Sequence, residues 1–249
     1  MKSVVSGFSR IVAAVMVALP LPALAAGRPV TFSSLDGTLL SGEFFEAANR
    51  PSSFARGASE DKSPGVVLVH MLSRHKGDWH GLPDRIREAG ITALTIDLRG
   101  HGGSSGSPSD LKAMVQDVRA AAQWLAARPN VRPDAIAIVG ASLGASLALL
   151  AAADAPLVRA IGLVSPSLDY RGLRTDTALV KRIGARPIWL AASTEDPLAL
   201  RTVRDFAAEP SGAREQHISS VAAHGTVLLD RDGDVARALV DWLRRSLLS

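Results

Sequence analysis

Residues 135–150 read AIAIVGASLGASLALL and contain Gly140-x-Ser142-x-Gly144 between two apolar segments. The segment before Gly140 is rich in β-branched residues and predicts a buried strand. The segment after Ser142 is rich in Ala and Leu and predicts a buried helix. A serine at such a corner lies on a sharp turn with its hydroxyl exposed, and the helix start directs free N–H groups toward it. We therefore expect Ser142 to be a nucleophile.

A second match to the same pattern occurs at Gly102-Gly103-Ser104-Ser105-Gly106, in a stretch rich in Gly and Ser. No helix begins directly at Ser104, so the structural context of a nucleophile is absent there. We expect this stretch to be a loop.

The first 25 residues predict a secretory signal peptide. Lys2 and Arg10 give a positively charged start, residues 11–19 are apolar, and Ala23 and Ala25 suit cleavage after residue 25. An uncleaved membrane anchor is the alternative. The apolar stretch is short for a span of about 20 residues, and prolines interrupt it. The sequence thus predicts a periplasmic or secreted protein with no stable membrane insertion after cleavage.

The composition limits what the remaining chain can be. Residues 26–249 have the length of a single α/β domain. Lys2 and Arg10 account for half of the net charge of +4 and the other basic residues are dispersed, so we expect no nucleic-acid partner. The chain has no cysteine, which excludes disulfides, thiolate metal sites and a cysteine nucleophile. No spacing of His, Asp and Glu suggests a metal site, and we expect no metal and no cofactor.

Apolar, strand-like segments alternate with helical segments along the chain. Asp36-Gly37 between two strand-like arms predicts a β-hairpin over residues 30–47. The alternation predicts an α/β fold, a mainly parallel doubly wound sheet with helices on both faces and this hairpin at one edge. Ser107 and Asp110 are expected to cap the helix at 108–127. The predicted strands after the hairpin are residues 65–70, 91–96, 135–139, 160–164, 187–192 and 217–221. The predicted helices are residues 78–89, 108–127, the segment after Ser142, 175–183, 198–207 and 235–247, and residues 48–63 are expected to form a loop.

Ligands of such sheets bind beyond the carboxyl ends of the strands. A serine hydroxyl there needs a base within hydrogen-bond reach, and the base needs an orienting carboxylate. Asp196 lies just past the strand 187–192, and His224 lies past the last predicted strand. The order Ser142, Asp196, His224 is the order expected of successive strand ends. These three are the predicted catalytic residues. The other polar residues at strand ends are His70, Asp97, Ser165 and Ser193.

Other residues could take these roles. His217 is the alternative base, but it begins a predicted strand and would point from the wrong end of the sheet. Glu195 and Asp169 are the alternative carboxylates. Asp97 is expected to be structural, pairing with Arg99 or capping its own loop. The remaining histidines are expected to be exposed loop or helix residues: His75, His80 and His101.

Acyl transfer also needs N–H donors for a developing oxyanion. Leu143 follows the nucleophile directly, so its backbone N–H is the first predicted donor. The second is expected from the loop after His70, with Leu72 as the first choice and Met71 as the second.

The residues that identify a family are Val69-His70, Asp97-Leu98-Arg99-Gly100-His101-Gly102-x-Ser104, Gly140-x-Ser142-x-Gly144, Asp196 and His224. In this order they resemble the α/β-hydrolase superfamily, and most closely its small members without a large lid, the dienelactone-hydrolase and esterase type. The resemblance covers residues 32–247 and implies a catalytic α/β-hydrolase domain. Members commonly carry glycine after the histidine, where this chain has Met71.

Only residues 165–186 separate two predicted strands where relatives often carry a lid. We therefore expect an open site for small or surface-presented acyl groups. The leading interpretation is a serine hydrolase that cleaves a small carboxylic ester through an acyl-enzyme. Thioester and amide hydrolysis, a peroxidase-like side activity and a non-catalytic binding domain stay open as alternatives. A Rossmann dehydrogenase is not favoured, because no G-x-G-x-x-G opens the helix after the strand at 65–70. The oligomeric state is not predicted.

Overall fold

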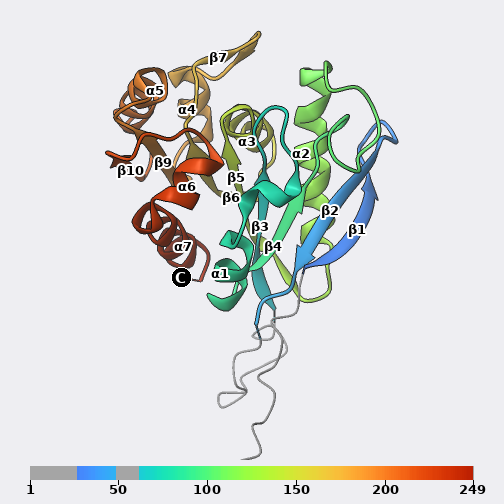
Figure 1. Ribbon diagram of the computed structural model, residues 1–249. Helices are drawn as coiled ribbons and strands as arrows, with labels where there is room; N and C mark the ends of the chain where they lie inside the picture. The colour runs from blue at the N-terminus through green and yellow to red at the C-terminus, as the bar shows by residue number, and fades with distance from the viewer. Residues whose placement is uncertain (1–26, 49–61, 249) are drawn as a thin grey trace, which may run out of the picture.

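The central strands of the sheet are buried and apolar on both faces. Parallel strands covered by helices must be so, and helices lie on both sides of this sheet (Figure 1). The computed structural model describes residues 27–48 and 62–248. In that part of the chain an eight-stranded sheet has the order β1-β2-β4-β3-β5-β6-β9-β10. Strands β1, β2 and β4 pair antiparallel, and all other pairs are parallel. The strands are β1 (Arg28–Ser33), β2 (Leu39–Phe45), β3 (Ser63–Val69), β4 (Thr92–Ile96), β5 (Val131–Ala141), β6 (Val158–Val164), β9 (Ile188–Ser193) and β10 (Arg214–Ser219).

Two apolar cores lie on opposite faces of the sheet. Alternate residues of β3 divide between them, with Val67 and Val69 in one core and Val66 and Leu68 in the other. The first core is covered by α2 (Leu111–Ala126), α3 (Leu143–Ala153), α4 (Thr177–Ile183) and α5 (Pro197–Ala207). The second is covered by α1 (Leu82–Glu88), α6 (Thr226–Arg231) and α7 (Gly233–Leu247). The predicted fold class is therefore confirmed, including the antiparallel hairpin at one edge.

Several element boundaries differ from the prediction. The helix predicted at 78–89 is a 3-10 turn, η1 (Lys76–Trp79), followed by α1, because the helix start is set by Gly81 with Pro83 in the first turn. Helix α2 begins later than predicted and is capped by Asp110, which accepts a hydrogen bond from Ala113 N–H at 3.0 Å. Its predicted partner Ser107 instead bonds the Ser109 hydroxyl.

Three small elements were not predicted. A short hairpin of β7 (Asp169–Tyr170) and β8 (Leu173–Arg174) lies between β6 and α4, and α6 follows His224. Strand β10 begins three residues before the predicted segment at 217–221. The predicted signal peptide and most of the predicted loop at 48–63 lie outside the described residues. No helix within 27–48 and 62–248 is long and apolar enough to cross a membrane.

The register of the parallel strands brings their carboxyl ends to one edge. Val69 of β3 pairs with Gly140 of β5, and Ala141 pairs with Val164 of β6. On the far side, Ser193 of β9 pairs with Ser219 of β10. Residues that follow these strand ends therefore meet at the same edge of the sheet.

Candidate active site

Ser142 lies on the sharp turn between β5 and α3. Its backbone has φ 52° and ψ −116°, a conformation that non-glycine residues adopt at a cost. This strained turn is kept because the backbone of β5, α3 and β3 packs closely around it. A side chain at Gly140 would lie 2.0 Å from the Gly144 carbonyl oxygen, and one at Gly144 would lie 2.1 Å from the Val69 carbonyl oxygen. Both glycines are therefore required for the helix to start beside the strands and for Ser142 to point outward.

His224 connects Ser142 to Asp196. Its Nε2 lies 2.8 Å from Ser142 Oγ, and its Nδ1 lies 2.5 Å from Asp196 Oδ2. Because a carboxylate accepts the Nδ1 proton, Nε2 is left free to accept the proton of the serine hydroxyl. The Asp196 carboxylate is itself fixed, since its Oδ1 caps α5 by accepting a hydrogen bond from Ala199 N–H at 3.2 Å. The His224 side chain is 50% exposed, so solvent reaches the group from one side.

Serines at strand ends hold the loops that carry the acid and the base. Ser193 Oγ donates to the Val221 carbonyl at 2.7 Å and accepts from Glu195 N–H at 3.0 Å, so one hydroxyl joins the two loops. Ser165 Oγ accepts from Gly225 N–H, the residue after His224, at 2.9 Å. Ser165 and Ser193 are strand-end residues as predicted, and their contacts are with the backbone of these loops.

The predicted oxyanion donors lie on two neighbouring segments. Leu143 is the first residue of α3, so its N–H has no acceptor within the helix. Met71 and Leu72 follow the buried His70 at the end of β3. His70 Nδ1–H donates to the Met71 carbonyl at 2.7 Å, and Nε2 accepts from Leu98 N–H at 3.1 Å. Burial lowers the pKa of His70 to about 4, which keeps this ring neutral.

Asp97 is buried and structural, as predicted, and of its two expected contacts it makes the one that caps its own loop. Its carboxylate accepts hydrogen bonds from Lys76 Nζ, Lys76 N–H and Gly103 N–H, and it makes no pair with Arg99. Burial would raise the pKa of this carboxyl, but the bonds from Lys76 and Gly103 outweigh it and hold the pKa below its ordinary value. Ser104 is a loop residue, as predicted, and its hydroxyl donates to the Asp97 carbonyl at 2.7 Å.

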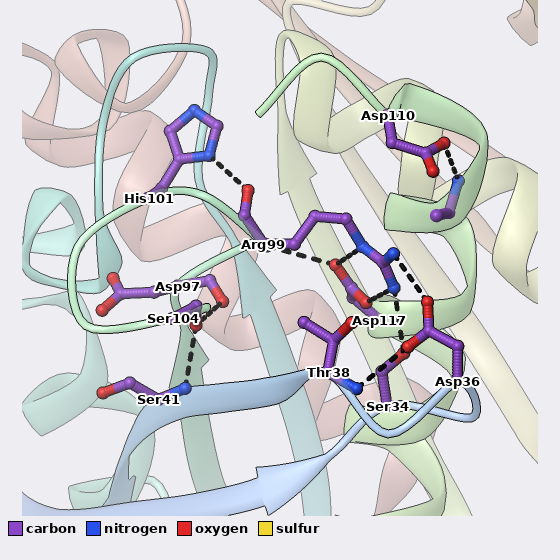
Figure 2. Close-up of polar contacts among 11 residues, drawn as sticks. Ser34, Asp36, Thr38, Ser41, Asp97, Arg99, His101, Ser104, Asp110 and Asp117 are labelled. Atoms are coloured by element: carbon purple, nitrogen blue, oxygen red, sulfur yellow. Dashed lines mark hydrogen bonds and ion pairs between the residues drawn. The ribbon is translucent and has the colours of Figure 1, made fainter. Parts of the chain in front are cut away.

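Arg99 pairs instead with Asp117 of α2 and with Asp36 of the hairpin turn (Figure 2). Asp117 was not among the predicted site residues. One signal was available in the sequence, because Asp117 lies three residues after Met114 and so falls on the apolar face of its helix.

Two of the alternative residues, His217 and Asp169, have partners other than Ser142 and His224. His217 is inside β10, where its ring stacks on Trp189 and Nε2 lies 2.9 Å from Glu215 Oε1. Asp169 is in β7, with Arg174 as its partner at 3.7 Å. His75 and His80 are exposed as expected, but His101 is buried and its Nδ1 lies 3.0 Å from the Arg99 carbonyl. The described residues contain no group of three His, Asp or Glu side chains that could hold a metal.

Comparisons with known proteins show the family and the fold of this chain. The sequence profile of the family described as serine aminopeptidase, S33, matches residues 61–194. An uncharacterised protein of Mycobacterium tuberculosis (strain CDC 1551 / Oshkosh), MT2364, is 31% identical over 247 residues, which cover 90% of this chain and 80% of the relative. The thiohydrolase apmlB of Arthrinium phaeospermum is 35% identical over 55% of this chain and 42% of its own length. Among solved structures, the Pyrococcus furiosus esterase Pf2001 superposes with a TM-score of 0.71 at 16% identity, over 90% of this chain and 94% of that chain.

Proposed function

Because the chain belongs to the S33 serine aminopeptidase family of α/β hydrolases, we propose that it is a serine hydrolase acting on carboxylic esters. The family makes the chain a hydrolase, and the proposal adds the nucleophile and the bond that is cleaved. The observation that supports it is the continuous pair of hydrogen bonds from Ser142 through His224 to Asp196. This is the arrangement that activates a serine hydroxyl.

In the first half of the proposed reaction, Ser142 Oγ attacks the ester carbonyl carbon and its proton passes to His224 Nε2. The carbonyl oxygen becomes an oxyanion, which accepts hydrogen bonds from the backbone N–H groups of Leu143 and Leu72, with Met71 as the alternative donor. Asp196 stabilises the imidazolium that forms. When the carbon–oxygen bond to the alcohol breaks, His224 gives its proton to the leaving oxygen, and the acyl group stays on Ser142.

In the second half, a water molecule attacks the acyl-enzyme and gives a proton to His224 Nε2. Collapse of the second tetrahedral intermediate releases the carboxylic acid and returns the proton to Ser142 Oγ. The half-exposed His224 gives water a direct approach to the acyl carbon. No step needs a metal or a cofactor.

The substrate is proposed to be a small or surface-presented ester. The segment between β6 and β9 holds only the β7–β8 hairpin and α4, which suits an open site. The same groups cleave thioesters and amides, and the thiohydrolase and aminopeptidase descriptions of similar proteins favour including both bonds in a test. A panel of esters, thioesters and amides of increasing acyl length separates these alternatives. A strong preference for long-chain esters would contradict the open site.

Labelling with a fluorophosphonate probe tests the proposed nucleophile. We expect the wild-type protein to be labelled, Ser142→Ala to be unlabelled, and Ser104→Ala, whose hydroxyl bonds the Asp97 carbonyl, still to be labelled. The alternative is a non-catalytic binding domain on the same fold. Equal labelling of Ser142→Ala, or an unlabelled wild type, would remove the proposed function.

We also propose that the protein is exported to the periplasm or beyond through its N-terminal segment. The support is the sequence, with Lys2 and Arg10 ahead of an apolar stretch and Ala25 at the cleavage position. Expression in a bacterial host with fractionation and N-terminal sequencing tests this. An N-terminus at residue 26 in the periplasmic fraction is the expected result, and full-length protein in the cytosol contradicts it.

A further inference from the structure

We propose that Lys76 and Asp97 are positioning residues that hold the segment 71–75 in place as an oxyanion-binding loop. The proposal rests on the proposed function, because it assigns a role to the loop that carries Leu72. It gives a role to two residues that are not part of the proposed nucleophile, base and acid. Neither is proposed to touch the substrate.

The segment is tied at both of its ends to the same short stretch after β4. At its start, the ring of His70 accepts a hydrogen bond from Leu98 N–H at 3.1 Å. At its end, Lys76 donates twice to Asp97, from the backbone N–H to Oδ1 and from Nζ to Oδ2, each at 2.6 Å. The five residues between these ties include both candidate donors of the second oxyanion hydrogen bond.

Asp97 is itself held in a fixed position. Its side chain has no exposed surface, and Oδ2 also accepts from Gly103 N–H at 2.8 Å. A side chain at Gly102 would lie 2.3 Å from Oδ2, so the backbone closes directly over the carboxylate. Ser104 Oγ donates to the Asp97 carbonyl and accepts from Ser41 N–H at 2.8 Å (Figure 2). The Asp97 carboxylate is therefore a fixed acceptor, and its two hydrogen bonds hold Lys76 in place at this edge of the sheet.

The stretch that carries Asp97, residues 97–104, is anchored a second time through the side chain of Arg99. Its guanidinium lies against Asp117 in the interior of the molecule, with Nε at 2.9 Å from Oδ2, and it also reaches Asp36 of the hairpin (Figure 2). Charge-assisted bonds of this kind are the stronger class of hydrogen bond. The stretch from residue 97 to 104 is thus a rigid support, and Lys76 is the link from it to the segment 71–75.

An oxyanion donor stabilises the transition state only when its N–H is already directed at the developing charge. A loosened loop therefore lowers kcat and leaves KM nearly unchanged. The test is Lys76→Met, which removes the Nζ bond but keeps the backbone N–H. Lys76→Arg is the conservative variant, and Arg119→Met is the matched control. Arg119 of α2 makes an ion pair of the same 2.6 Å length with Asp154 at the C-terminal end of α3.

For each variant, kcat is measured per active site titrated with fluorophosphonate, together with KM and the inhibition constant of a trifluoromethyl ketone. Ser142 Oγ adds to the carbonyl carbon of this ketone. The resulting oxyanion lies in the position of the oxyanion formed from an ester. We expect Lys76→Met to lower kcat about tenfold and to raise the inhibition constant of the ketone by a similar factor. This loss is smaller than that for deleting an oxyanion donor outright, because the donor is still present. We expect Lys76→Arg to recover most of both, and Arg119→Met to change neither.

A purely structural role would reduce the number of titrated sites and leave kcat per site and the ketone constant unchanged, which would overturn the proposal. Amide hydrogen exchange gives a readout that does not need activity. Amides of residues 71–75 should exchange faster in Lys76→Met than in wild type, while those of α2 should not change. A wild-type protein that the probe does not label would overturn the proposed function. Unchanged exchange of amides 71–75 in Lys76→Met would instead overturn the proposal that Lys76 and Asp97 hold this segment.

Discussion

Asp117 lies fully buried on the inner face of α2 and accepts three hydrogen bonds from Arg99. The guanidinium donates from Nε and Nη2 and the backbone from N–H, at 2.9, 2.5 and 3.1 Å. Burying a charge pair costs desolvation free energy, so the pair adds little net stability over apolar residues of similar size. Removing Asp117 alone is different, because the buried Arg99 then keeps only the half-exposed Asp36 as a charged partner.

Asp117→Ala is therefore expected to lower the free energy of unfolding by about 3–5 kcal/mol. Urea unfolding followed by circular dichroism measures this. The control is Asp234→Ala, which breaks an exposed pair with Arg237 of 2.8 Å and should change the free energy by less than about 0.5 kcal/mol. A loss for Asp117→Ala as small as that of the control would show that Arg99 finds other partners.

Asp196→Asn should separate catalysis from stability. Asn is as good an N-cap as Asp, so α5 should keep its cap and the unfolding free energy should change by less than about 1 kcal/mol. The amide no longer fixes the His224 tautomer, so kcat should fall by roughly three to four orders of magnitude. Asp176→Asn is the matched control, since Asp176 caps α4 in the same way through Leu179 N–H at 3.0 Å. Equal activity loss in the two variants would disconnect Asp196 from the chemistry.

Gly144→Ala should prevent the sharp turn at Ser142, the elbow between β5 and α3, from forming. The added methyl group would lie 2.1 Å from the Val69 carbonyl oxygen, which is backbone and has no room to move. We expect loss of fluorophosphonate labelling together with destabilisation of about 2 kcal/mol or more. Gly233→Ala, at the start of α7, meets no atom within 4 Å and should instead stabilise the protein by about 0.5–1 kcal/mol. Thermal unfolding of both variants and wild type tests whether Gly144→Ala lowers the stability and Gly233→Ala raises it.

His70 should make stability fall with acid. Its pKa is lowered by burial from 6.5 to about 4, so between these values the unfolded chain binds a proton that the folded chain does not. Stability is therefore full above about pH 6.5 and is lost as the pH falls toward 4, by about 3 kcal/mol for this group. Asp97 acts in a lower range, because its pKa lies below the ordinary carboxyl value.

Urea unfolding of wild type and His70→Asn at pH 7.5 and 4.5 measures the histidine contribution. The variant should be less stable than wild type at pH 7.5 and should lose less stability on acidification. A fall in the variant equal to that of wild type would assign the acid sensitivity to other groups.

The fold could be predicted because its signals are local in the sequence. The alternation of apolar strands with helices, the Asp36-Gly37 turn and the elbow around Ser142 each depend on neighbouring residues. The positions of Asp196 and His224 followed from strand ends alone, and the structure places both within hydrogen-bond distance of their expected neighbours. Whether they act in catalysis is what the variants above test.

The missed features depend on contacts between distant segments. Lys76 and Asp97 are 21 residues apart, and nothing in either neighbourhood indicates that they pair. Asp97 was expected to pair with nearby Arg99 or to cap its own loop. It caps the loop through Gly103 N–H, while Arg99 reaches α2 and the hairpin. His101 was expected to be an exposed loop or helix residue, yet it is buried and its ring lies against that of His70 at 5.1 Å between centroids. Such pairings are decided by the register of strands, which a local pattern does not contain.

The two outermost strands of the sheet have a consequence for self-association. Strand β10 carries Arg214, Glu215 and His217, and Glu215 is bound by Arg245 of α7. Strand β1 begins with Arg28 and Pro29, and proline offers no N–H to a neighbouring chain. Both rims of the sheet thus discourage strand addition between copies, and the protein should stay dispersed at high concentration rather than polymerise edge to edge.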